Sequence, residues 1–145
     1  MKGNLLKIKA IKANREWCDK DHVLLCACFQ ILVDFIEKEK PDKIIDVVHN
    51  KKQKRMWKEL KVLYRYWKID RPKMEKEEQK ALMKWSKTYE WKTVLDPNGG
   101  PFANHVTLRN DKRLQKLHWR LEDKLHKQED EMLQRLINIR HHLWC

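Results

Sequence analysis

The fold is decided by the stretch from Arg109 to Trp144, RNDKRLQKLHWRLEDKLHKQEDEMLQRLINIRHHLW, which contains neither Pro nor Gly. An eleven-residue step separates Leu114, Leu125 and Leu136, and this period of about 3.67 residues per turn is close to that of an undistorted helix. We therefore expect one long, nearly straight helix of roughly 50 Å, packed within its own bundle. A dimeric coiled coil would favour a sustained seven-residue repeat instead. The whole apolar stripe comprises Leu114, Leu117, Leu121, Leu125, Met132, Leu136, Ile139 and Leu143.

Gln128 interrupts this stripe and is followed by three consecutive acidic residues. The helix is expected to pass a polar spot here, so that its two halves have different neighbours. The half from Met132 to Trp144 is predicted to belong to the core. The other half is the better candidate for contact with another molecule, and the predicted protein interface consists of Leu114, Leu117, Trp119, Leu121 and Leu125.

Three further helices are predicted upstream of this stretch. The segment His22–Glu39 is apolar almost all round, so we expect it in the middle of a bundle, with Pro41 ending it. Residues 53–67 and 73–91 each carry apolar side chains at the spacing of one helix face. The sequence Asp70-Arg71-Pro72 is predicted to break the chain between them.

The chain of 145 residues is long enough for an independent core, and we predict a single helical domain over residues 1–145. Its fold class is mainly α, a helical bundle of about four helices with a long C-terminal helix. Residues 1–17 are interpreted as a basic N-terminal arm or a short β-strand, because Leu6, Ile8 and Ala10 alternate with polar neighbours. Residues 96–108 are predicted to be a loop, since Asp96-Pro97-Asn98-Gly99-Gly100-Pro101 is rich in turn formers.

Charge is the dominant feature of the composition. The formal net charge is +12, and 37% of the residues are charged. Such a surplus favours encounters with nucleic acid, acidic proteins or anionic lipid without choosing among them. The most apolar run, residues 23–36, is too short to span a bilayer, which needs about 20 apolar residues. With no secretory pattern at its start, the chain is expected in the cytoplasm, without a membrane partner and with reduced cysteines (Cys18, Cys26, Cys28 and Cys145).

Basic residues concentrate at the start of the second predicted helix and in the N-terminal arm. They are candidates for binding phosphates or an acidic partner, and the alternative is a solvated helix face. Trp57 and Tyr64 share the stripe of Leu60 and Leu63, which favours a core position over stacking on bases. The candidate binding residues are Lys51, Lys52, Lys54, Arg55 and Lys58, with Lys7, Lys9 and Lys12 in the arm.

Two smaller sets of polar residues have a functional and a structural interpretation. His118, Glu122 and His126 recur at i, i+4 and i+8, which is compatible with ligands of a divalent metal, although ion pairs on the helix surface explain the spacing more simply. Asp34 lies one turn from Gln30 in the most apolar helix. We interpret this pair as a narrow polar edge facing an Arg or Lys, with Arg135 and Arg140 as possible partners.

The sequence contains no nucleophile elbow, phosphate-binding Walker loop, His-Glu-x-x-His or Cys-x-x-Cys motif. We therefore expect a protein that is not an enzyme, with no catalytic residue, no cofactor and no bound metal. Three stretches together resemble a group of small uncharacterised accessory proteins of tailed bacteriophages. They are His22–Glu37, Leu63–Trp67 with Arg71-Pro72, and Glu129–Arg140 with Leu143-Trp144.

The resemblance implies an accessory factor in the cytoplasm of an infected bacterial host. The leading hypothesis is a binding protein whose partner is a host or phage protein, for example a component of a host defence or regulatory system. The alternatives are a basic nucleic-acid-binding protein and, third, a metal-assisted hydrolase. The sequence is compatible with a monomer or a small homo-oligomer.

Overall fold

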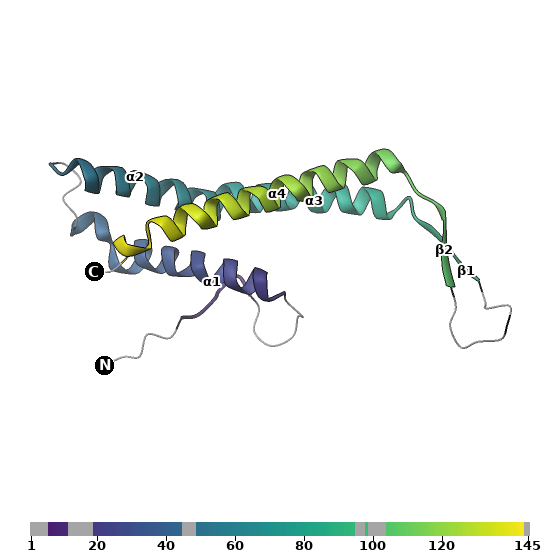
Figure 1. Ribbon diagram of the computed structural model, residues 1–145, viewed down its shortest axis with the longest axis horizontal. Helices are drawn as coiled ribbons and strands as arrows, with labels where there is room; N and C mark the ends of the chain where they lie inside the picture. The colour runs from purple at the N-terminus through teal and green to yellow at the C-terminus, as the bar shows by residue number, and fades with distance from the viewer. Residues whose placement is uncertain (1–5, 12–18, 45–48, 95–97, 99–103, 144–145) are drawn as a thin grey trace. The chain divides into compact units, whose positions relative to one another are not determined.

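The structure is a computed structural model that describes residues 6–11, 19–44, 49–94, 98 and 104–143. Figure 1 shows its long α-helices and a two-stranded sheet. The predicted fold class, a mainly α helical bundle of about four helices with a long C-terminal helix, is confirmed. The α-helices are α1 (Lys20–Asp34), α2 (Lys51–Arg65), α3 (Arg71–Ser86) and α4 (Lys112–Asn138). Short helical turns are η1 (Phe35–Glu39), η2 (Pro41–Lys43), η3 (Tyr66–Asp70) and η4 (Arg140–His142), and the strands are β1 (Glu90–Val94) and β2 (Asn104–Arg109).

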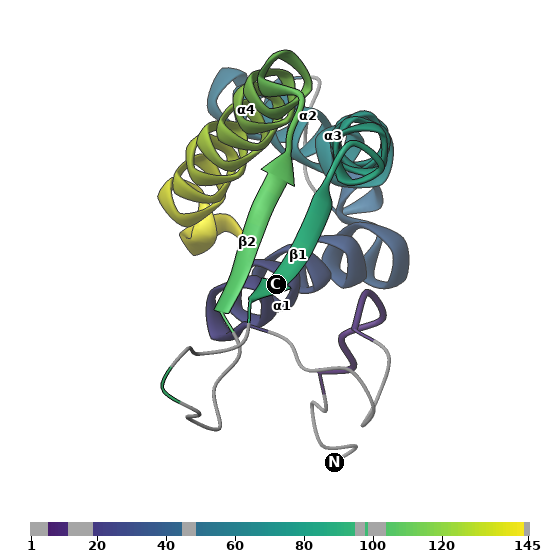
Figure 2. The same ribbon diagram turned by 90° about the vertical axis from the view of Figure 1, so that its right-hand side faces the viewer.

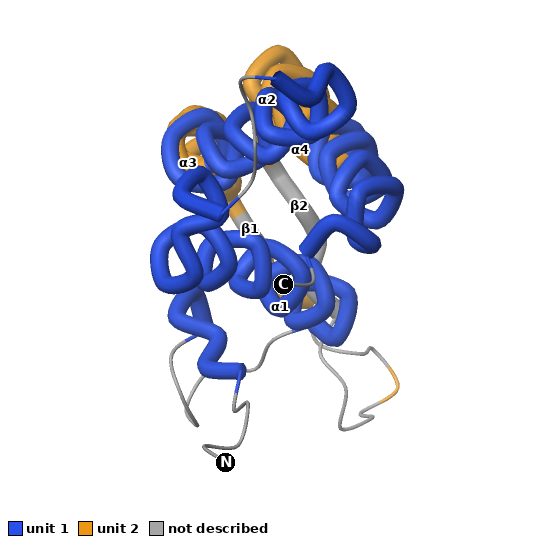
Figure 3. The backbone as a smooth tube through the Cα atoms, turned by 90° about the vertical axis from the view of Figure 1, so that its left-hand side faces the viewer, with its two compact units in different colours: residues 1–71, 127–145 blue, residues 72–126 orange. Residues whose placement is uncertain are grey.

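The chain divides into two compact units, where the sequence predicts one domain. Residues 1–71 and 127–145 form unit 1, and residues 72–126 form unit 2 (Figure 3). Helix α4 contributes residues to both units, so the two are continuous along the chain.

The core of unit 1 is built from one face of α1, one face of α2 and the last turns of α4. Its fully buried residues include Phe29, Leu32, Leu60 and Leu63, which recur at helical spacing in their segments. From α4, Met132 and Leu136 are buried in the same cluster, and Ile139 and Leu143 pack against it. The core position predicted for this half of α4 is therefore confirmed up to Leu143, and Trp144 lies outside the described residues.

Helix α1 forms where the sequence predicts it, and the π-helical turn η1 continues it to Glu39. It ends at Lys40, which has a left-handed backbone with φ 50°, and Pro41 follows. The predicted position of α1 in the middle of the bundle is wrong, because its apolar residues Leu24 and Ile31 are exposed. A residue spacing alone cannot tell a central helix from one with an uncovered apolar strip.

The predicted break at Asp70-Arg71-Pro72 is also wrong. Helix α2, the π-helical turn η3 and α3 follow one another without a gap. Pro72 has no N–H, so it leaves a carbonyl of the preceding turn without its usual donor. The π turn lies immediately before Pro72, and its last donor, the N–H of Arg71, bonds to the carbonyl of Tyr66, five residues back. This change of hydrogen-bond register accommodates the proline within helical structure.

Unit 2 contains α3, the strand pair and the first half of α4. Helix α3 ends at Ser86 rather than near Trp91, because the hydroxyls of Ser86 and Thr88 bond to the carbonyls of Met83 and Trp85 at 2.9 and 2.7 Å. Strands β1 and β2 then pair antiparallel, with Thr93 opposite His105 (Figure 2). The loop predicted over residues 96–108 is thus shorter, since β2 begins at Asn104.

The N-terminal arm has no strand in residues 6–11, so that alternative is wrong for the described part of the segment. Its contact with the body is a hydrogen bond from the Lys9 N–H to Oε1 of the buried Gln30, at 3.2 Å. The arm therefore lies against α1 by a backbone contact rather than by sheet pairing.

Helix α4 begins where Asp111 accepts hydrogen bonds from the N–H groups of Arg113 and Leu114.

Candidate functional site

The most distinctive surface of unit 1 is the solvent side of α2. The helix begins at a capping residue, because the side chain of Asn50 accepts hydrogen bonds from the N–H groups of Lys52 and Gln53 at 3.0 and 3.2 Å. Met56, Leu60 and Leu63 turn inward and are buried. The opposite side exposes cations at nearly every turn. We call this surface the α2 basic face, and it consists of Lys51, Lys52, Lys54, Arg55, Lys58, Lys61 and Arg65, all exposed.

The aromatic residues of α2 do not add to this face. Trp57 is partly buried and packs against the core, as the sequence predicts. Tyr64 is half-buried, and its hydroxyl donates a hydrogen bond to Glu37 on η1 at 2.8 Å. The ammonium of Lys61 lies 5.9 Å from the centre of the Trp57 ring, which holds that cation beside the helix surface.

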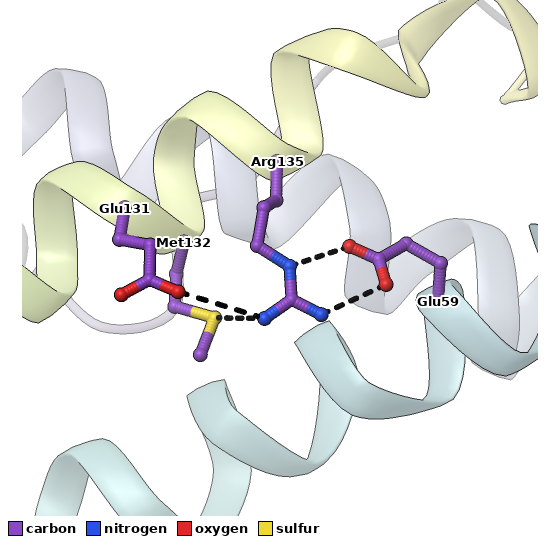
Figure 4. Close-up of polar contacts among 4 residues, drawn as sticks. All are labelled: Glu59, Glu131, Met132 and Arg135. Atoms are coloured by element: carbon purple, nitrogen blue, oxygen red, sulfur yellow. Dashed lines mark hydrogen bonds and ion pairs between the residues drawn. The ribbon is translucent and has the colours of Figure 1, made fainter.

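The only carboxylate in the α2 segment is already neutralised. Arg135 of α4 donates hydrogen bonds from Nε and Nη2 to the two oxygens of Glu59, at 2.6 and 2.8 Å (Figure 4). These hydrogen bonds hold the pKa of Glu59 below its usual range. The guanidinium also touches the sulfur of Met132, at 3.7 Å, so the pair sits against the core. Glu59 is therefore not free to cancel the charge of its neighbours on α2.

A second acidic residue of unit 1, Glu37, is also paired with a cation. Lys68 on η3 lies 2.9 Å from Oε1 of Glu37, the oxygen that also accepts the Tyr64 hydroxyl. The hydrogen bond from Lys68, followed by that from Tyr64, lowers the pKa of Glu37, and the same contact raises the pKa of Lys68. By contrast, Lys51, Lys52, Lys54, Arg55 and Lys58 have no acidic partner within the described part of the chain.

The structure places the other predicted residues of the basic set differently. Lys7 and Lys9 are exposed in the N-terminal arm, whereas Lys12 lies outside the described residues. Hydrogen bonds from Lys38 and Lys68 are the main causes that lower the pKa values of Asp34 and Glu37, and the charge of Lys9 adds a smaller effect on both. Lys9 thus faces the acidic end of α1.

The polar edge of α1 is confirmed, but its partner is not the one expected. Gln30 donates to Asp34 at 2.9 Å, and Lys38, one turn further along, lies 2.8 Å from the same carboxylate. Arg135 binds Glu59 instead, and Arg140 donates to the carbonyl of Ile137. The cation therefore comes from the same helix as the carboxylate.

In unit 2 the predicted protein interface is only partly free. Leu114, Leu117 and Leu121 are half-buried, and Leu125 is buried. Trp119 differs from them, since 53% of it is exposed. Its ring lies 6.4 Å from that of Trp85 on α3. The surface predicted from the leucine stripe is thus reduced to one exposed aromatic residue.

The histidines of α4 do not converge on a metal site. His118 is buried, its Nδ1 lies 3.1 Å from Oε1 of Glu78 on α3, and its ring packs on Trp85. Nδ1 makes no hydrogen bond at this distance. Glu122 is half-buried and His126 is exposed. Among the residues that the structure describes, no three His, Cys, Asp or Glu side chains group as metal ligands.

Sequence reasoning missed Lys61 and Arg65, although both continue the spacing of Lys51, Arg55 and Lys58 on one helix face. It also missed the pairing of Glu59 with Arg135, for which residues far apart in the chain give no local signal. Comparison with protein-family models, with curated proteins and with solved structures finds no match to this chain. No described helix is long and apolar enough to cross a membrane.

Proposed function

We propose that this protein binds nucleic acid without catalysing a reaction, and that the α2 basic face contacts the phosphate backbone. The observation that carries the proposal is a row of exposed cations whose only carboxylate neighbour on α2 is held by Arg135. Lys51 and Arg65 lie about 21 Å apart at 1.5 Å per residue. A straight row of this length matches a linear polyanion.

Lysine predominates on this face, which favours contact with phosphates over reading of base edges. Lysine acts as a point charge, whereas bidentate recognition of bases relies on arginine. Binding is therefore expected to depend weakly on sequence and strongly on salt. An acidic protein offers the same charge in a compact patch, which fits a row of about four helical turns less well than a nucleic-acid strand does.

A host or phage protein as partner remains the second hypothesis. It is supported by Trp119, because an exposed Trp is a frequent anchor of protein interfaces. The leucines predicted to accompany Trp119 are half-buried or buried, so little exposed apolar surface is available for a protein partner. The phage accessory role in an infected bacterial cytoplasm and the absence of enzymatic activity stay predictions drawn from the sequence.

The proposal is tested by fluorescence anisotropy with a labelled DNA duplex at a series of salt concentrations. The variant Lys54→Gln/Lys58→Gln removes two cations of the α2 basic face. The matched control, Lys73→Gln/Lys76→Gln, removes two exposed lysines of α3 and gives the same net charge. The α2 variant is expected to lower the log–log salt slope by about 1.8, since each phosphate contact contributes about 0.9. The control is expected to leave that slope unchanged.

Two results would overturn the proposal. The first is an equal effect of both variants, which would mean that net charge alone governs binding. The second is the absence of binding to duplex DNA and RNA at low salt. Tight binding of polyglutamate, with an α2-dependent salt slope and no binding of nucleic acid, would assign the α2 basic face to an acidic protein instead.

A further inference from the structure

We propose that Trp119 and the neighbouring cations of α4 form a stacking site for an unpaired base of single-stranded nucleic acid. This inference rests on the proposed function and extends it to unit 2. The α2 basic face is proposed to contact the phosphate backbone, whereas the site at Trp119 is proposed to contact a base. A large aromatic ring left exposed on a basic surface is the arrangement by which proteins bind single strands with little sequence preference.

The ring of Trp119 stands on a fixed support. Trp85 meets it edge to face, with ring centres 6.4 Å apart and an angle of 74°. Trp85 is itself held by a hydrogen bond from Nε1 to Asn110, at 2.7 Å, and by ring contacts with Tyr89 and His118 at 5.0 and 5.4 Å. Trp119 therefore presents its exposed part from a packed aromatic cluster, which reduces the entropy lost when a base stacks on it.

Charged side chains border the exposed ring, with cations in excess. Lys112 and Lys116 precede Trp119 by seven and three residues, so they lie on the same side of α4, and Arg120 is its neighbour. All three are exposed and have no acidic partner among the described residues. Two carboxylates, Glu122 and Asp123, also lie on this side of α4, three and four residues after Trp119, and Asp123 already has an interaction within the chain. The net charge around Trp119 is therefore positive, which suits the phosphates that flank a base.

The same surroundings argue against an apolar protein partner at this site. Leu117 and Leu121 are half-buried, and the residues next to Trp119 on its exposed side are charged. A protein interface centre is expected to be depleted in charged residues. A nucleotide combines an aromatic base with an anionic phosphate and therefore complements both components of this surface.

The test compares binding of a labelled oligothymidylate with binding of a duplex of the same length. Trp119→Ala is expected to weaken oligothymidylate binding by roughly 5- to 150-fold, the range that corresponds to one stacked base. Its salt slope should stay unchanged, because no phosphate contact is lost, and duplex binding should also stay unchanged. Trp119→Phe, which keeps a ring, is expected to retain most of the affinity. The control is Met83→Ala, which truncates a side chain of α3 that is 59% exposed and should change neither binding constant.

Circular dichroism first establishes that each variant is folded, and Trp119→Leu, which keeps an apolar side chain but no ring, provides the test if Trp119→Ala is not. Equal affinities of wild type and Trp119→Ala for oligothymidylate would overturn the inference, as would equal losses for single strand and duplex. If duplex binding keeps its dependence on Lys54 and Lys58 while Trp119→Ala has no effect, the stacking site alone is refuted. If neither nucleic acid binds at low salt, the proposed function fails as well.

Discussion

Replacing Glu59 by Gln is expected to lower the free energy of unfolding by about 1–2 kcal/mol. The two short hydrogen bonds from Arg135 set this magnitude, together with the partial burial of the pair, whose side chains are 33% and 29% exposed. Fully exposed ion pairs contribute about 0.2–1 kcal/mol, and hydrogen bonds to charged groups contribute about 1.5–3 kcal/mol. A half-buried bidentate pair falls between these ranges, because solvent screens part of the attraction.

The measurement is urea denaturation followed by circular dichroism, with Glu131→Gln as the matched control. Glu131 also approaches Arg135, but at 3.9 Å and with 65% of its side chain exposed, so its replacement is expected to change stability by less than about 0.5 kcal/mol. For a chain of this size, the Glu59 variant should unfold roughly 2–8 °C lower in a thermal scan. Equal destabilisation by the two substitutions would refute the reasoning from geometry.

The same pair predicts a dependence on pH with a defined sign. Arg135 lowers the pKa of Glu59 in the folded protein, so the stability it contributes is present above the unfolded-state pKa and is lost as pH falls through the folded-state pKa. The difference in free energy of unfolding between wild type and Glu59→Gln is therefore expected to be largest at neutral pH and to vanish in acid. The variant should also bind duplex DNA more tightly, because it leaves the positive charge of Arg135 without its carboxylate partner.

Three further predictions concern unit 1. Leu136→Ala should destabilise the protein by about 2–5 kcal/mol in urea denaturation, because the Leu136 side chain is only 3% exposed. Truncating the neighbouring Ile137, which is 39% exposed, should cost much less. Similar losses for the two variants would contradict the inward orientation of Leu136 on α4. Asn50→Ala should cost about 1 kcal/mol by the same assay, since two N–H groups lose their acceptor, while Asn50→Asp should retain the cap. Glu37→Gln should lower the free energy of unfolding at neutral pH, and this loss should disappear as pH falls through the lowered pKa of Glu37. If wild type and Glu37→Gln differ in free energy of unfolding by the same amount at every pH in an acid titration, the contact with Lys68 is contradicted.

Periodic patterns predicted the helices and their inward faces, because helical spacing is a local property of the sequence. The stripe of α4 gave both its helical state and the core position of Met132 and Leu136. The same reasoning overestimated the breaking effect of Pro72. A π turn changes the hydrogen-bond register over a few residues, and composition carries no signal for it.

The candidate site was predictable in part for a related reason. The cations of α2 are adjacent in sequence, so their exposure follows from the helical position of Met56 and Leu60 on the opposite face. Their lack of compensation was not predictable, because it depends on Glu59 meeting Arg135 from another helix. The exposure of Trp119 beside half-buried leucines likewise depends on how α3 packs against α4, which no spacing along a single helix defines.

The α2 basic face also has a consequence for the free protein, because like charges on one helix repel one another. This mutual repulsion opposes folding, and Lys51 and Lys52 add to it at the helix start, where the helix dipole disfavours cations. Added salt screens the repulsion, so the unbound protein should become more stable as ionic strength rises, while its hold on nucleic acid weakens. A bound polyanion removes the same repulsion by neutralisation and should raise the unfolding temperature in low salt. Ionic strength therefore acts on this chain in two opposite directions, and the crossover between them sets the salt range in which the protein is both folded and bound.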